Sequence, residues 1–179
     1  MAEIKSTLDL VMERTRHLTL TEEEKQEHTL TEFKKGLSGL IQRCRDGALA
    51  PDRFKQDLGR LQAGSHVTDE GIVLDEIQKR WDLGGDNSWA YNLLEAFDID
   101  PKGIATVCDE YLKAFDKASM NRIHAIRKEL EEKHAIQGPA VFPNLASDRE
   151  WTGEKQRLQG HFESLLAGEF DKMKRALKA

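Results

Sequence analysis

The sequence predicts an all-α protein, an elongated helical bundle with three long helices and several short ones. Apolar residues recur three and four positions apart in nearly every segment, which is the pattern of helices with one buried face. No segment shows the two-residue alternation of a half-buried strand. Charged residues make up 33% and hydrophobic residues 39% of the chain, with only four prolines, a balance typical of a water-soluble helical protein. A chain of 179 residues can bury one core without metal or disulfides, so we expect residues 1–179 to form a single domain.

The segment 1–20 carries the first one-sided apolar pattern. Its members are Ile4, Leu8, Val11, Met12 and Leu18. This spacing predicts an amphipathic helix, which is not stable alone because its apolar face needs a surface to cover it. We therefore expect residues 1–20 to form a helix that projects from the domain or contacts a partner.

The first long helix is expected over about residues 22–46. Thr21 and Glu24 have the spacing of a capping box, in which each side chain accepts a hydrogen bond from a backbone N–H at the start of the helix. Gly47 is suited to end the helix by adopting a left-handed conformation. The expected buried stripe consists of Leu30, Phe33, Leu37, Leu40, Ile41 and Cys44.

Two glycines, Gly36 and Gly39, interrupt this helical pattern. Each glycine costs up to about 1 kcal/mol of helix stability relative to alanine. A close crossing of another helix would explain why the cost is tolerated, and so would a simple bend.

Short helices are expected between the first long helix and residue 97. Pro51 suits the first position of a helix because no N–H is needed there, and this helix should end near "AGSH". Thr68 or Asp69 can begin the next helix, which the two glycines of "LGGDNS" break. Asp86 or Asn87 can then cap a short helix over "SWAYNLLEAF".

Two further long helices are expected over about residues 101–134 and 148–177. The first lacks an internal proline and would run to roughly 50 Å at 1.5 Å per residue. Ser147 and Glu150 have the spacing of a capping box that starts the second. Between the two helices, "QGPAVFPNLAS" is the clearest loop of the chain, with two prolines and a glycine.

The length of these helices favours self-association. Three helices of this length overhang the globule that 179 residues form when they pack compactly. Some apolar stripe is then left to face another chain, and soluble assemblies are mostly symmetric homo-oligomers. We predict a homodimer that forms through the long helices.

The segment 98–109 has some features of a calcium-binding loop. Asp98, Asp100 and Gly103 occupy positions 1, 3 and 6 of that pattern, whereas position 5 is Lys102 and position 12 is Asp109 in place of the usual glutamate. A lysine ammonium and a shortened carboxylate both weaken metal binding. We expect instead a corner between two helices, in which Asp100 accepts a hydrogen bond from the N–H of Lys102 or Gly103. Metal binding by Asp98, Asp100 and Asp109 is the alternative.

Other combinations of reactive residues do not predict an enzyme. Glu131 and His134 have the spacing of a di-iron ligand pair, but the sequence has no second copy of this motif. Ser65 and His66 are adjacent, and neighbours in sequence do not face each other as catalytic partners do. We expect no enzymatic activity, no catalytic residues and no cofactor.

The net charge of −5 argues against a nucleic-acid-binding domain, which needs a surplus of cations. Two basic stretches could meet an anionic partner or form solvated helix faces. Their cations are Lys117, Arg122, His124, Arg127 and Lys128 in the first, and Lys172, Lys174, Arg175 and Lys178 in the second.

The sequence shows neither a signal-peptide pattern at its start nor a run of about eighteen apolar residues. We therefore expect a cytoplasmic protein without a membrane span. Cys44 and Cys108 lie far apart in sequence, which indicates neither a zinc site nor a disulfide framework. Each lies on an apolar helical stripe, where reduced cysteine acts as a small hydrophobe.

Two stretches, "AEIKSTLDLVMERT" and "GPAVFPNLASDREW", resemble a small family of uncharacterised bacterial all-helical proteins. The resemblance implies a bacterial cytosolic origin, and it implies no activity or catalytic residue. It also draws attention to the loop before the last helix, in which Val141, Phe142 and Leu145 are apolar. We expect these three side chains to fill a groove between helices.

These observations favour a non-enzymatic helical interaction or scaffold protein, because the sequence has long amphipathic helices and no set of polar residues that would form an active site. The alternative is a small-ligand or metal-binding helical protein, which would use Asp98 and Asp100 or a polar pocket near Trp81 and Trp89. A third hypothesis is binding to anionic surfaces through the two basic stretches.

Overall fold

The computed structural model describes residues 21–177, and within them the chain is all-helical, as the sequence predicts. The elements are α2 (Glu22–Arg45), α3 (Pro51–Ser65), α4 (Glu70–Gln78), α5 (Ser88–Ala96), α6 (Lys102–His134), the short 3-10 helix η1 (Leu145–Ser147) and α7 (Arg149–Ala176). The three long helices α2, α6 and α7 match the ranges expected for them to within one or two residues. The helix expected over residues 1–20 lies outside the described residues.

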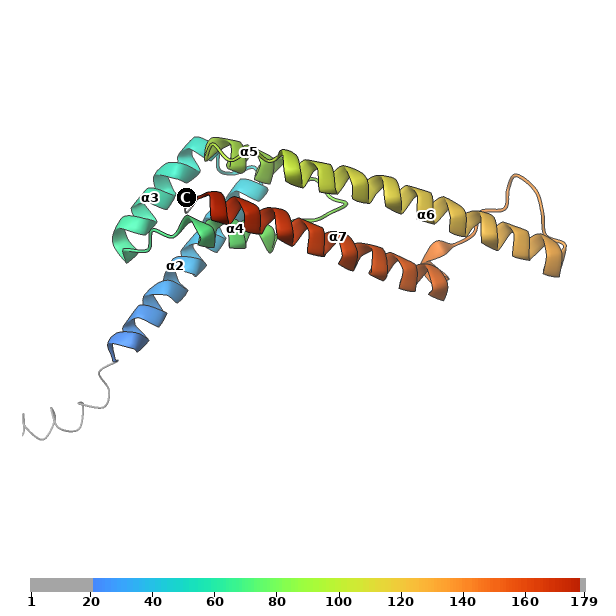
Figure 1. Cartoon of the computed structure of the whole chain (residues 1–179), viewed down its shortest axis with the longest axis horizontal. Coiled ribbons are helices and arrows are strands. Elements are labelled where there is room, and N and C mark those ends of the chain that lie inside the picture. The colour runs from blue at the N-terminus through green and yellow to red at the C-terminus, as the bar shows by residue number, and fades with distance from the viewer. Residues whose placement is uncertain (1–20, 178–179) are drawn as a thin grey trace, which may run out of the picture.

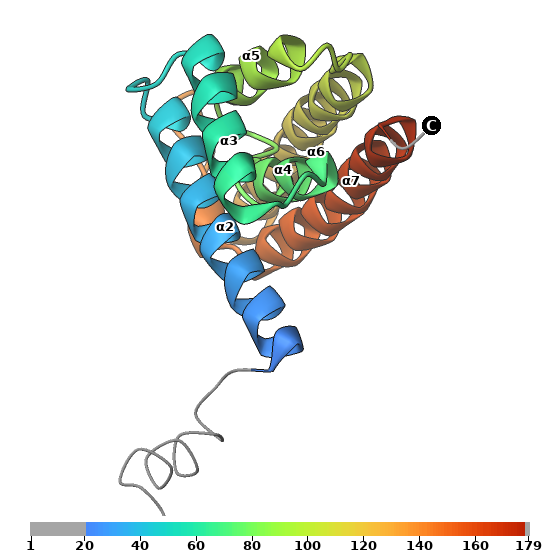
Figure 2. The ribbon, with the colours of Figure 1, turned by 90° about the vertical axis from the view of Figure 1, so that its left-hand side faces the viewer.

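The described chain forms a helical head and a projecting arm (Figure 1). The head contains α2 to α5 and the parts of α6 and α7 that pack on them. The arm, residues 112–165, is an antiparallel pair made by the rest of α6 and α7 with the loop that joins them. Figure 2 shows the head end-on, with α2 and α3 side by side and α4 lying toward α7. At 1.5 Å per residue, the 33 residues of α6 span about 50 Å.

The main hydrophobic core lies in the head. All six α-helices of the described chain contribute side chains that are almost completely buried: Phe33, Leu37, Ile41, Phe54, Leu74, Ile77, Leu93, Leu94, Ile104 and Phe170. Burying one such side chain stabilises a fold by about 1.5–3 kcal/mol. Each helix turns its apolar stripe toward this common centre, which is why the helices converge there.

A buried ion pair joins α4 to α2 within the head. Glu76 is 6% exposed, and its carboxylate accepts hydrogen bonds from Lys79 and Arg80. Arg80 also donates to the hydroxyl of Ser38 in α2. Desolvation raises the pKa of Glu76, but the hydrogen bonds and charges of Lys79 and Arg80 outweigh it and the pKa is lowered. The carboxylate therefore stays charged and partnered beside the core.

The ends of α2 follow the sequence signals. Thr21 accepts from the N–H of Glu24 at 3.2 Å, and the Glu24 carboxylate accepts from the N–H of Thr21 at 2.7 Å, so the predicted capping box is confirmed. Gly47 has φ 71°, as expected for a residue that ends a helix. The N–H of Ala48 donates to the carbonyl of Arg43 at 2.8 Å and closes the last turn.

The predicted capping box between Ser147 and Glu150 is wrong. Ser147 belongs to η1, and its hydroxyl donates to the carbonyl of Asn144. The residue that caps α7 is Asp148, whose carboxylate accepts from the N–H of Trp151 at 2.6 Å. The 3-10 turn shifts the start of the helix by one residue, so Glu150 is free to form an ion pair.

The two glycines of α2 differ in their surroundings. A Cβ added to Gly36 would lie 2.9 Å from Cδ1 of Leu61 in α3, whereas a Cβ added to Gly39 would meet nothing within 4 Å. The close helix crossing that the sequence suggested therefore exists at Gly36 and not at Gly39. None of the helices within residues 21–177 has an apolar stretch long enough to cross a membrane.

This difference predicts opposite outcomes for two alanine substitutions. Gly39→Ala should raise the free energy of unfolding by up to about 1 kcal/mol, since alanine favours the helix and nothing opposes its methyl group. Gly36→Ala should gain less or destabilise, because Leu61 must move to admit the methyl group. Urea unfolding of both variants measures the difference, and equal gains at the two positions would contradict the crossing.

Candidate functional site

The loop between α6 and α7 presents an exposed aromatic side chain at the far end of the arm. Val141 and Leu145 are half-buried, but Phe142 is 81% exposed. The expectation that all three side chains fill a groove is therefore wrong for Phe142. Neighbours in an extended loop point to opposite sides, so once Val141 faces α6 the ring of Phe142 faces outward.

An arginine of α6 fixes the point at which this loop ends and α7 begins. Arg122 donates from Nε to Oδ1 of Asp148 at 2.9 Å and from Nη2 to Oδ2 at 2.6 Å. Its third nitrogen lies 2.6 Å from a carboxylate oxygen of Glu150. The hydrogen bonds from Arg122 and from the N–H of Trp151 lower the pKa of Asp148. One carboxylate thus caps α7 and anchors it to α6, a bidentate arrangement that arginine forms well.

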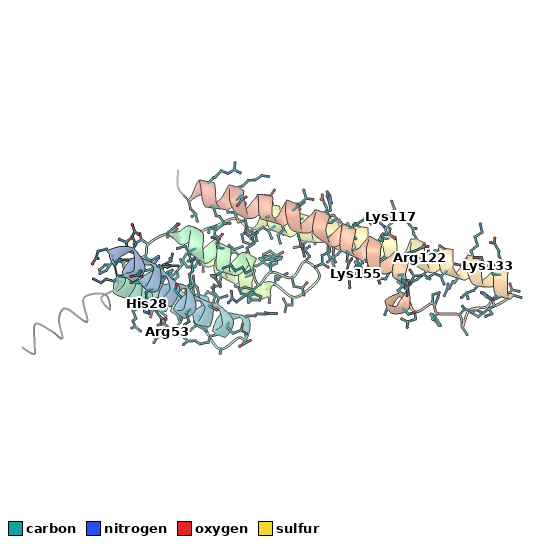
Figure 3. The ribbon with its side chains drawn as sticks, turned by 90° about the horizontal axis from the view of Figure 1, so that it is seen from below. His28, Arg53, Lys117, Arg122, Lys133 and Lys155 are labelled. Atoms are coloured by element: carbon teal, nitrogen blue, oxygen red, sulfur yellow. The ribbon has the colours of Figure 1, made fainter. Side chains whose placement is uncertain are left out.

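A second arginine holds the middle of the loop. Arg127 donates from Nε to the carbonyl oxygen of Val141 at 3.1 Å. Its guanidinium carbon lies 5.8 Å from the centre of the Phe142 ring, within the range of a cation–π contact. Phe142 is therefore presented on a loop that is attached to α6 at Arg122 and Arg127. Figure 3 shows the position of Arg122 on α6 in the arm, far from His28 and Arg53 in the head.

Much of the positive charge in the two basic stretches is matched within the described chain. Arg122 and Arg127 hold the loop, and Lys128 lies 3.8 Å from Glu132. In α7, Lys172 pairs with Glu169 at 2.6 Å. Lys174 pairs with Asp75 of α4 at 2.6 Å and with Asp171 at 3.4 Å. These contacts pair the cations with acids of the same helix or of a neighbouring helix, and they favour the solvated-face interpretation over an anionic partner.

A cleft of about 600 Å³ lies where the arm leaves the head. Its walls come from the end of α4, the loop over residues 79–87, α6 and the exposed side of α7. The lining residues are Gln78, Lys79, Trp81, Asp82, Leu83, Gly84, Tyr111, Leu112, Phe115, Lys155, Gln159, Glu163 and Leu166. Its size falls within the range of small-molecule sites, and its lining mixes aromatic and polar groups as those sites do.

Asn87 holds the loop that forms one wall of this cleft. Its side-chain oxygen accepts from the N–H of Asp82 at 3.1 Å, and its amide donates to the carbonyls of Asp82 and Gly85. Asp86 meanwhile accepts from the N–H of Ser88 at 2.9 Å, at the start of α5. Of the two caps that the sequence offered, Asn87 occupies the N-cap position but uses its side chain to shape the turn, and Asp86 supplies the side-chain hydrogen bond to the first residue of α5. This division fixes Asp82 at the edge of the cleft.

Tyr111 lies at the floor of the cleft between two acidic side chains. The residue is only 6% exposed, and its pKa is raised by desolvation and by the negative charges of Asp82 and Glu163. Within residues 21–177 its hydroxyl forms no hydrogen bond, and no buried side-chain oxygen or nitrogen lacks a partner. The Tyr111 hydroxyl is therefore accessible, and it reaches solvent through the cleft.

Only one of the two tryptophans suggested by the sequence reaches this cleft. Trp81 lines it and packs edge-to-face on Tyr91 and Phe170, with ring centroids 5.1 and 5.7 Å away. Its indole N–H points to the sulfur of Cys108 at 3.3 Å. Trp89, by contrast, is buried in the core. The sequence suggested, as an alternative, a polar pocket near Trp81 and Trp89, but it did not indicate Tyr111 or Glu163, because those residues come from helices distant in sequence.

The segment 98–109 forms the predicted helix corner. Asp98 has φ 58° and ends α5 in a left-handed conformation, and the N–H of Ile99 returns to the carbonyl of Leu94 at 2.9 Å. Asp100 accepts from the N–H of Lys102 at 3.0 Å, which confirms the expected hydrogen bond. Asp109 lies two turns into α6. Across the described residues, no group of three or more His, Cys, Asp or Glu side chains is placed to hold a metal ion.

The remaining reactive residues have local structural roles. Ser65 donates its hydroxyl to the carbonyl of Leu61 at 2.8 Å, and His66 ends α3 with φ 56°. Cys44 and Cys108 are both buried and free. Burial raises the pKa of the Cys44 thiol to about 11, so this thiol stays protonated and unreactive at neutral pH.

The Arg122–Asp148 pair predicts a pH-dependent effect of one substitution. Because the pKa of Asp148 is lowered in the folded chain, its contribution to stability is full above about pH 4 and is lost as pH falls below that value. Asp148→Asn should therefore lower the unfolding midpoint in urea at pH 7. At pH 3 its effect should be smaller, because protonation has already removed part of the contribution of Asp148, and asparagine still caps the helix at both pH values. Asp69→Asn, at the α4 cap, is the control without an arginine partner. Equal losses at both pH values would contradict the ion pair.

Comparison with known proteins identifies no relative of this chain. No protein-family model matches the chain, no curated protein is similar to it, and no solved structure matches its fold. The resemblance to a family of bacterial helical proteins stays a prediction, and one of its two stretches lies within the first twenty residues. The exposed loop of the arm and the cleft beside the head are thus the two features that carry a functional argument.

Proposed function

We propose that the protein is a non-enzymatic helical interaction protein whose arm binds other protein chains, with a second copy of itself as the first partner. The proposal keeps the bacterial origin and the cytoplasmic location expected from the sequence. The observation that carries it is Phe142, a large aromatic side chain that is 81% exposed on an anchored loop. Aromatic side chains of this kind are enriched among the residues that dominate binding energy at protein interfaces.

The anchoring of the loop supports this role. Arg122 and Arg127 attach the end and the middle of the loop to α6 through three hydrogen bonds, and Arg122 also pairs with Glu150 in the first turn of α7. A loop that is already ordered loses less conformational entropy when a partner binds. The loop therefore presents Phe142 at little entropic cost.

Further apolar exposure along the arm supports a second chain as partner. Met120 is 58% exposed, and Leu112, Leu165 and Ile136 are each at least 40% exposed. Burying such side chains is favourable, by about 25 cal/mol per Å² of apolar surface. Soluble proteins most often meet this need by forming symmetric dimers.

The cleft favours a second function, the binding of a small ligand. A volume of about 600 Å³ and a lining of three aromatic rings with two unmatched carboxylates are features of a ligand site. This function uses residues of the head and the base of the arm, so it is compatible with self-association at the far end. The metal-binding form of this alternative has no comparable support in the described part of the chain.

Self-association is tested by sedimentation velocity at micromolar concentrations. The native chain should sediment with twice the mass of one chain, and Phe142→Ser should weaken self-association by about tenfold, which corresponds to a loss of about 1.4 kcal/mol. The exposed position of Phe142 means that thermal unfolding of the dilute protein should be unchanged. Gln56→Ser, an exposed change on α3, serves as the control. A mass of one chain at these concentrations would show that a second copy is not the partner.

A further inference from the structure

The cleft at the base of the arm has unmatched negative charge. Glu163 accepts a hydrogen bond from the uncharged amide of Gln159 at 2.8 Å, and Asp82 accepts from the N–H of Gly84 at 3.1 Å. Neither carboxylate forms an ion pair with any residue between 21 and 177. Other carboxylates in this range, such as Glu76 and Asp148, do have a cation as partner. The negative charges of Asp82 and Glu163 are thus available to a bound ligand.

The two lysines that line the cleft do not cancel this charge at its floor. The ammonium of Lys79 is bound to Glu76, outside the acidic pair. Lys155 lies on α7 eight residues before Glu163, which places it about 12 Å away along the helix at 1.5 Å per residue. Neither lysine therefore forms an ion pair with Asp82 or Glu163 in the described chain.

The wall next to the two carboxylates is aromatic. Trp81, Tyr111 and Phe115 line it, and the centroids of the Tyr111 and Phe115 rings are 5.9 Å apart. The faces of such rings attract cations, most strongly where water is partly excluded. Tyr111 is only 6% exposed as a residue, and its hydroxyl, which has no hydrogen-bond partner within the described chain, adds an accessible polar group at the floor.

We propose that this cleft binds a small organic cation, an alkylammonium or quaternary ammonium group, with Asp82 and Glu163 matching its charge and Trp81, Tyr111 and Phe115 enclosing its carbon atoms. An anionic ligand would meet two carboxylates at the floor and is repelled. A metal ion is disfavoured because two carboxylates and a phenol leave most of its coordination positions to water. The proposal rests on the ligand-binding function proposed for the cleft, and it does not depend on self-association through Phe142.

Calorimetric titration with tetramethylammonium and n-butylammonium tests the proposal, with n-butanol and butyrate as matched neutral and anionic probes. We expect both cations to bind with Kd on the order of 1 mM, which for five non-hydrogen atoms is within the attainable binding energy per atom. Butanol and butyrate should bind at least tenfold more weakly. Binding of butyrate as tight as that of butylammonium, or no saturable binding of either cation, would overturn the proposal.

Charge-removing variants locate the binding. Glu163→Gln and Asp82→Asn should each raise the Kd for tetramethylammonium by at least about threefold, because each removes one of two nearby charges while keeping the shape of the side chain. Glu154→Gln, an exposed change on the same helix outside the cleft, should leave the Kd unchanged. An unchanged Kd in both cleft variants would place any binding elsewhere and overturn the proposal. Phe142→Ser should bind the cation normally, so that failure of this site and failure of self-association are distinguished.

Discussion

The bidentate contact between Arg122 and Asp148 sets the register of the arm, and the rest of the molecule's surface depends on that register. Asp148 is both the cap of α7 and the partner of α6, so the last helix begins opposite one particular position of its neighbour. From that start, antiparallel packing brings Trp151 against Phe115 and Phe162 against Tyr111, with ring centroids 5.3 and 5.6 Å apart. A shift of one residue would rotate α7 by about 100° and separate these pairs.

The same register places Glu163 across the cleft from the loop that carries Asp82. The cleft is thus a consequence of how α7 meets α6, and not of a local motif. At its other end the register leaves α6 longer than the helix that pairs with it. The loop over residues 135–148 packs along this unpaired part of α6. Phe142 is exposed because no other segment of the described chain packs on the outer side of the loop.

The head and the arm meet different physical demands. The head buries large apolar side chains from six helices, and the carboxylate of Glu76 beside this core is matched by two cations. The arm has too few neighbours to bury its side chains on every face, so apolar groups such as Met120 remain exposed. The proposed partner surface and the proposed ligand site both lie in the arm or at its base, where the fold leaves side chains uncovered.

The sequence by itself determined the helices, because three- and four-residue periodicity, Thr21 with Glu24, Gly47 and Pro51 are local signals that act within one turn. It also determined that Asp100 accepts a hydrogen bond from the N–H of Lys102 just before α6, since the proline after Asp100 restricts the backbone. Only the tertiary structure decided which cap begins α7, because the choice of Asp148 over Ser147 depends on an arginine 26 positions away. The same holds for the cleft and for the exposure of Phe142. Their character depends on which residues of α6 and α7 face each other, and that pairing is fixed by packing and by one ion pair between distant parts of the chain.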